Sequence, residues 1–101
     1  MNRETASPAS AVTIVLDGDT DAGYALASQL LNDGRRVAVV ARHAANAVRV
    51  MHGQSFDRLV VIAADVGDRR QWSRVVDRVM DRFGRIDTVV RADQATLRAT
   101  A

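Results

Sequence analysis

Three short apolar runs, all rich in β-branched residues, limit most strictly what this chain can fold into. They span residues 11–16 (AVTIVL), 36–40 (RVAVV) and 59–63 (LVVIA). A strand buried on both faces of a parallel sheet has such a continuous apolar sequence, whereas a strand with one solvated face alternates apolar and polar residues. Residues 88–90 form a fourth, shorter candidate. The sequence therefore predicts four strands of a parallel sheet.

Segments of helical length separate the expected strands. Residues 23–32 and 69–83 carry apolar side chains three or four positions apart, and residues 44–51 form a shorter candidate helix. Gly34 stands where a helix C-cap glycine belongs, and Asp68 can cap the long third helix. Alternating strands and helices with right-handed crossovers predict a Rossmann-like, three-layer α/β/α fold. Its parallel four-stranded sheet should have the order 3-2-1-4.

The length and composition fit one globular domain. The chain has 101 residues, of which 48% are hydrophobic and 26% charged, so it is too apolar to stay disordered. We expect a flexible N-terminal arm at residues 1–10, a Rossmann-like domain at 11–94 and a C-terminal tail at 95–101. Two helices would cover one sheet face and only one the other, so we expect apolar surface that a partner covers.

The charge, hydropathy and cysteine content indicate which partners and which location to expect. The net charge is only +2, and the arginines alternate with aspartates along the third expected helix, which is typical of a solvated surface. We therefore expect no nucleic-acid partner. No segment approaches the roughly 18 consecutive apolar residues of a membrane span, so we expect no membrane partner. The absence of cysteine fits a reducing compartment, and we expect a cytoplasmic location.

Three stretches of the chain resemble the short-chain dehydrogenase/reductase family. Residues 83–87 (FGRID) are similar to the family's sequence before its fourth strand, and residues 64–66 (ADV) to its sequence after the third. Arg42 follows the second strand, where members that use the phosphorylated cofactor have a basic residue. The resemblance covers nearly the whole chain. It implies a nucleotide site with Asp65 and Val66 at the adenine and Arg42 at the 2′-phosphate, which favours NADP(H) over NAD.

The family's pyrophosphate-binding turn, T-G-x-x-x-G-x-G, is altered here. In register stand residues 16–23 (LDGDTDAG), so two glycine positions hold Asp17 and Asp21 and only the last glycine is retained. Gly18 can compensate in part through a shifted turn. The resemblance implies that the contacts to the pyrophosphate come from Gly18, Thr20, Ala22 and Gly23.

Three carboxylates, those of Asp17, Asp19 and Asp21, surround this turn. At an effective dielectric constant near 20, a carboxylate about 4 Å from a phosphate charge costs on the order of several kcal/mol. NADP(H) binding should therefore be weak. An alternative is that the aspartates bind the free N–H groups at the start of the first helix themselves and so replace the ligand.

The residues of the family's chemistry are missing. Residues 91–94 (RADQ) stand in place of its N-N-A-G, the only tyrosine is Tyr24 in the first expected helix, and the chain has no lysine for a Y-x-x-x-K motif. We therefore predict no catalytic residues, and a truncated or degenerate family relative that binds NADP(H) without catalysing a reaction alone. The alternative is a non-enzymatic interaction domain. It would form a homo-oligomer or dock on a full-length oxidoreductase through its open sheet face.

Two further enzyme-like interpretations start from the acidic turn. In a phosphatase of the haloacid dehalogenase type, Asp17 would be the nucleophile and Asp19 the acid/base, with Mg²⁺ bound nearby. In a receiver-like domain, Asp65 would join them. Both interpretations lack the supporting lysine. His43 and His52 have no matching carboxylate pattern, so we expect no metal site.

Overall fold

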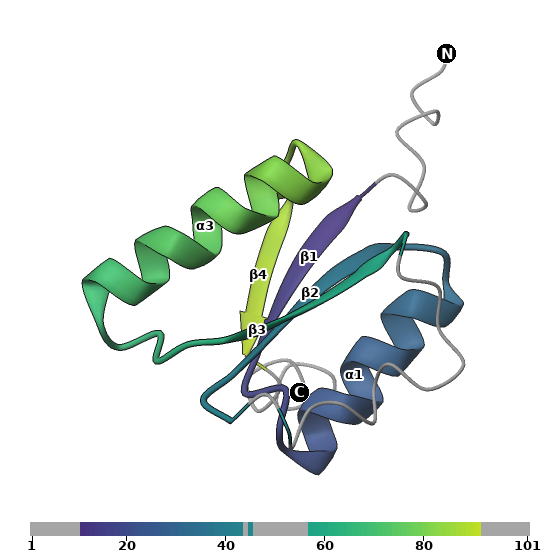
Figure 1. Ribbon diagram of the computed structural model, residues 1–101. Helices are drawn as coiled ribbons and strands as arrows, with labels where there is room; N and C mark the ends of the chain where they lie inside the picture. Colours follow the sequence, from purple (N-terminus) through teal and green to yellow (C-terminus); the bar gives the residue numbers. More distant parts are fainter. Residues whose placement is uncertain (1–10, 44, 46–56, 92–101) are drawn as a thin grey trace.

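The computed structural model of the chain describes residues 11–43, 45 and 57–91 (Figure 1). Its elements are β1 (Val12–Leu16), α1 (Asp21–Asn32), β2 (Arg36–Ala41), β3 (Leu59–Ala63), α3 (Arg69–Phe83) and β4 (Thr88–Arg91). All strand pairs are parallel and the order is β3-β2-β1-β4, so the predicted α/β fold and strand order are confirmed. The expected helix at 44–51, apart from Ala45, lies outside the described residues, as do the expected arm and tail.

Alternation along the buried strands divides the core into two clusters, one on each face of the sheet. On the α3 face the strands contribute Val12, Ile14, Leu16, Ala38, Val40 and Ile62, which pack against Val75, Val79 and Phe83 of the helix. On the α1 face they contribute Val15, Val37, Val39, Ala41 and Leu59, which pack against Ala27 and Leu31. Figure 1 shows the two helices on opposite sides of the sheet. Burial of both strand faces explains the continuous apolar runs.

The first helix begins two residues earlier than its apolar spacing predicts. Thr20 is the N-cap, and its Oγ1 accepts a hydrogen bond from Gly23 N at 3.0 Å. The hypothesis that an aspartate is the N-cap of this helix is therefore wrong. Asp21 does lie in the first turn, where its negative charge interacts favourably with the positive end of the helix dipole. The predicted glycine after the helix is confirmed, since Gly34 follows the C-cap with φ 90°.

The third helix begins where the sequence predicts. Asp68 is its N-cap, and the carboxylate Oδ1 accepts from Arg70 N at 2.9 Å and from Gln71 N at 3.4 Å. The pKa of Asp68 is below its ordinary value because these backbone N–H groups, that of Gln71 first, stabilise the ionised form. The helix ends at Phe83 and is followed by Gly84 as C-cap.

The two outer strands, β3 and β4, differ in exposure from the central pair. In β4 both Thr88 and Val89 are exposed, Val89 to 44%. The described residues place α1 on one face and α3 on the other, so the expected unequal covering of the faces stays a prediction. None of the helices in the described part of the chain is long and apolar enough to cross a membrane.

Candidate functional site

Segments that follow β1, β2 and β3 meet at the carboxyl edge of the sheet, where ligands of open α/β sheets bind. They enclose a cavity of about 200 Å³. Its lining consists of Asp17, Val40, Ala41, Arg42, Ala64, Asp65, Val66, Gly67 and Arg91. Of the sequence-predicted site residues, Arg42, Asp65 and Val66 line this cavity. Gly18, Thr20, Ala22 and Gly23 are outside its lining.

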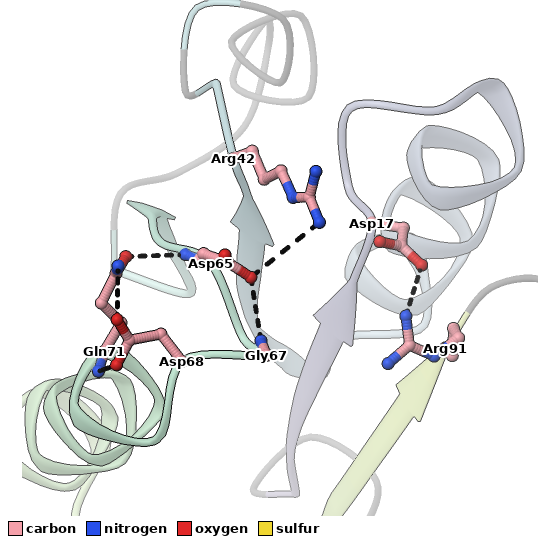
Figure 2. A network of polar contacts seen from close by, with 7 residues as sticks. All are labelled: Asp17, Arg42, Asp65, Gly67, Asp68, Gln71 and Arg91. Atoms are coloured by element: carbon pink, nitrogen blue, oxygen red, sulfur yellow. Dashed lines mark hydrogen bonds and ion pairs between the residues drawn. The ribbon is translucent and has the colours of Figure 1, made fainter.

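The segment after β3 is hydrogen-bonded to the start of α3 (Figure 2). Asp65 N donates to Gln71 Oε1 at 2.8 Å, and Gln71 Nε2 donates in turn to the carboxylate of Asp68 at 3.3 Å. Gly67 N donates to Asp65 Oδ1 at 2.9 Å. Among the described residues, Val66 N has no acceptor. The segment therefore presents the carboxylate of Asp65 next to the backbone N–H donor of Val66.

Arg42 extends from the end of β2 to the mouth of the cavity. Its Nη2 lies 4.0 Å from Asp65 Oδ1, and its side chain is 74% exposed (Figure 2). An ion pair this long and this exposed contributes little to stability. The guanidinium therefore remains accessible to an anionic group of a ligand.

The turn after β1 keeps a backbone conformation that favours glycine, although an aspartate occupies it. Asp17 has φ 57°, in the left-handed region, which Asp and Asn tolerate better than most residues. Its carbonyl oxygen accepts from Thr20 Oγ1 at 2.7 Å and from Thr20 N at 3.1 Å. These bonds fix the turn, and Thr20 thereby links the turn to the start of α1.

Close packing explains the two glycines, Gly18 and Gly23, that are present in the turn. A Cβ on Gly18 would lie 2.0 Å from Val39 Cγ1, and a Cβ on Gly23 would lie 2.3 Å from the carbonyl oxygen of Asp17. Gly18 N also donates to Val40 O at 3.0 Å, which ties the turn to β2. Gly18 therefore lets the turn approach β2 closely, and Gly23 lets the start of α1 approach the turn, which side chains would prevent.

An ion pair between Asp17 and Arg91 is the site feature that sequence reasoning missed. Arg91 Nη1 donates to Asp17 Oδ2 at 2.9 Å, with side chains 41% and 42% exposed (Figure 2). Arg91 ends β4, and its Cα is in register with that of Leu16, next to Asp17. The predicted strand order already placed the ends of the first and fourth strands side by side. A basic residue there was the signal that could have revealed the pair.

The acidic residues do not gather around a metal position. Within residues 11–43, 45 and 57–91, no group of three or more His, Asp or Glu side chains is arranged to hold a metal ion. Asp17 instead pairs with Arg91, and Asp65 faces Arg42. These contacts give neither the phosphatase-like nor the receiver-like interpretation any support.

A doubly wound sheet with a cavity at its carboxyl edge is the architecture of a Rossmann-like α/β domain. The family model described as short chain dehydrogenase matches residues 11–95. The chain therefore belongs to the short-chain dehydrogenase family of oxidoreductases, and the resemblance stated from its sequence is confirmed. No match was found among curated proteins.

Solved structures of this family have the same fold. A short chain dehydrogenase from Bacillus anthracis is 20% identical with a TM-score of 0.78, over 84% of this chain and 35% of that one. Glucose dehydrogenase of Caenorhabditis elegans is 22% identical with a TM-score of 0.77, over 82% and 37%. A 3-ketoacyl-(acyl-carrier-protein) reductase from Brucella melitensis, complexed with NADH, is 24% identical with a TM-score of 0.72, over 78% and 32%. The chain spans about a third of the length of these structures.

Proposed function

We propose that this chain is an NADP(H)-binding module that holds the cofactor mainly by its adenosine end. The observation that carries the proposal is the cavity lined by Arg42, Asp65 and Val66. The carboxylate of Asp65 and the backbone N–H of Val66 form an acceptor next to a donor, which suits the amino group and ring nitrogen of adenine. Arg42 provides an exposed guanidinium for the 2′-phosphate, because its fork of donors matches phosphate oxygens.

The Asp17–Arg91 pair reduces the electrostatic repulsion between the acidic turn and a bound phosphate. The charged side chains that line the cavity are two arginines and two aspartates, so their formal charges cancel. An unpaired carboxylate about 4 Å from a phosphate would cost on the order of 4 kcal/mol at a dielectric constant near 20. With Arg91 in contact, much of that repulsion is removed. Weak binding, rather than exclusion of the cofactor, is therefore what we expect.

At the pyrophosphate end, some of the backbone N–H groups at the start of α1 already donate within the chain. Gly23 N donates to Thr20 Oγ1, and Thr20 N donates to Asp17 O, so two of the N–H groups that the helix start could offer to a phosphate already have acceptors. We propose that Gly18, Thr20, Ala22 and Gly23 shape the turn beside the pyrophosphate and contribute little affinity. The contacts to the adenosine end would then contribute most of the binding affinity.

Titration of the purified chain with NADPH by calorimetry tests this proposal. We expect saturable binding, weaker binding of NADH, and a loss of about tenfold or more in NADPH affinity for Arg42→Ala, since a hydrogen bond to a charged group contributes about 1.5–3 kcal/mol. Arg69→Ala, at an exposed arginine of α3, is the matched control and should bind as the original chain does. Absence of saturation at millimolar NADPH, or equal affinities for NADH and NADPH, would contradict the proposal.

We further propose that the chain does not catalyse a reaction by itself. It has no lysine, and its only tyrosine, Tyr24, lies on α1 rather than at the cavity. Mixing the chain with NADPH and a panel of carbonyl compounds should therefore leave the nicotinamide absorbance unchanged. Oxidation of NADPH that depends on both the chain and the carbonyl would refute this part of the proposal.

Exposed apolar surface on β4 favours a second candidate, a non-enzymatic interaction domain. Val89 is 44% exposed on a strand at the edge of the sheet. A second copy or a full-length oxidoreductase would cover this region. Sedimentation velocity at rising concentration should then show association that Val89→Lys abolishes, whereas Met80→Lys, at an equally exposed position on α3, leaves it intact. A monomer at every concentration would count against self-association.

The cytoplasmic location stays a prediction.

A further inference from the structure

A second groove lies between α3 and β3. Its volume is about 360 Å³, and of its lining residues only Ala64 is shared with the nucleotide cavity. Three arginines of α3, Arg70, Arg74 and Arg78, line it. Its apolar side includes Ile62 and Val75, which are almost fully buried. The groove therefore combines a basic wall with an apolar floor.

The three arginines recur at every fourth residue, so they lie along one side of the helix. No ion pair joins Arg70, Arg74 or Arg78 to another residue in the described part of the chain, although Asp68 is close enough to Arg74 to interact electrostatically. Asp68 also lines the groove, and its carboxylate caps the helix. Three positive charges against one negative charge leave the groove with an excess of positive charge.

The other wall of the groove is an edge strand. β3 is the last strand of the sheet on its side, and pairs only with β2 among the described elements. Its exposed Ala63 lines the groove. An edge strand presents unpaired backbone N–H and C=O groups, which can pair with an added strand.

The spacing of the arginines matches the repeat of an extended peptide. Positions i and i+4 of a helix are separated by about 6 Å along its axis. Side chains on one face of a strand recur every two residues, about 6.6 Å apart. Long, flexible arginine side chains can absorb the remaining difference. A strand with acidic residues at alternate positions can therefore place one carboxylate near each guanidinium.

We propose that this groove binds an extended acidic segment of a partner protein, which adds to the edge of β3. Its alternate acidic residues pair with Arg70, Arg74 and Arg78, and the intervening side chains point to the opposite face of the sheet. A peptide fits the site better than a nucleic acid does. None of the groove's lining residues is aromatic, so bases have no stacking platform, whereas the strand edge offers a row of backbone donors and acceptors with the repeat of another peptide strand.

Fluorescence anisotropy with the full chain tests the proposal. The probe is a labelled, end-blocked peptide, Glu-Val-Glu-Val-Glu-Val-Glu, and its control is Glu-Glu-Glu-Glu-Val-Val-Val, which has the same composition without alternation. We expect saturable binding of the alternating peptide and at least tenfold weaker binding of the control. N-methylation of the probe's backbone at alternate residues should abolish binding, because it removes the donors for strand pairing.

Substitutions in the chain locate the contact. Arg74→Gln should weaken binding of the alternating peptide about tenfold, while Arg69→Gln, which removes the same charge from an exposed position outside the groove, should change it less than twofold. Circular dichroism checks that both variants keep their helices. The proposal is overturned if the two peptides bind equally, if N-methylation has no effect, or if a thymidine heptanucleotide binds more tightly than the alternating peptide.

Discussion

At the scale of single residues, Asp87 shows how one carboxylate joins distant parts of the chain. Its Oδ2 accepts from Val12 N at 2.7 Å, and its own backbone N donates to Val12 O at 2.9 Å. Its Oδ1 accepts from Arg85 Nη2 at 2.6 Å. Because Val12 is fully buried, its N–H needs a protein partner. The last residue of the FGRID stretch thus holds the beginning of β1.

Asp87→Asn should make the stability of the fold less dependent on pH. The pKa of Asp87 lies below its ordinary value of 3.8, first because of the Arg85 guanidinium and then because of Val12 N–H. Since the folded state binds this proton less readily than the unfolded state, the stabilisation is complete above pH 3.8 and is lost as pH falls through the lowered pKa. In urea unfolding between about pH 6 and 2, the variant should lose less stability on acidification.

The control for this variant is Asp77→Asn, at an exposed position of α3 outside these contacts. Near pH 7, Asp87→Asn should cost on the order of 1 kcal/mol, because an amide oxygen still accepts from Val12 N while the Arg85 pair is lost. If acidification destabilises the Asp87 variant as steeply as the unaltered chain, Asp87 is not the group that titrates.

At the scale of elements, Thr20 couples the turn after β1 to α1. Its hydroxyl accepts from Gly23 N and donates to Asp17 O. Thr20→Ala should lower the free energy of unfolding by about 1 kcal/mol, which is typical for loss of an N-cap. Thr20→Ser keeps the hydroxyl and should retain most of the stability. Urea unfolding of the three proteins measures this, and an alanine variant as stable as the original would show that the cap contributes nothing.

Element positions were predictable wherever buried side chains set a period. The apolar runs gave the strands, and the 3.6-residue spacing from Trp72 to Phe83 gave α3, whose cap at Asp68 is a local signal. The start of α1 was misplaced because its first two residues, Asp21 and Ala22, have a charged and a small side chain and carry no apolar period. Sequence spacing could not pair Asp17 with Arg91, which are 74 residues apart and meet only through the parallel register of β1 and β4.

At the scale of the whole molecule, the sheet brings oppositely charged groups from four separate segments to one edge. Arg42 faces Asp65 across the ends of β2 and β3, and Arg91 pairs with Asp17 across the ends of β4 and β1 (Figure 2). Exposed ion pairs of this kind contribute only about 0.2–1 kcal/mol to stability. Their larger effect should therefore be on the charge that a bound phosphate experiences.

Arg91→Ala should weaken NADPH binding more than it weakens the fold. Removal of Arg91 leaves the carboxylate of Asp17 without its partner beside the turn, and we expect about a tenfold loss of affinity, equivalent to about 1.4 kcal/mol. Asp17→Asn in the same chain removes the uncompensated charge while keeping a residue that tolerates φ near 57°. The double variant should therefore bind NADPH within about threefold of the original chain, a difference below 1 kcal/mol. Calorimetry on the three proteins measures these affinities. Equal affinities of the single and double variants would mean that the charge of Asp17 does not affect the binding of the phosphates.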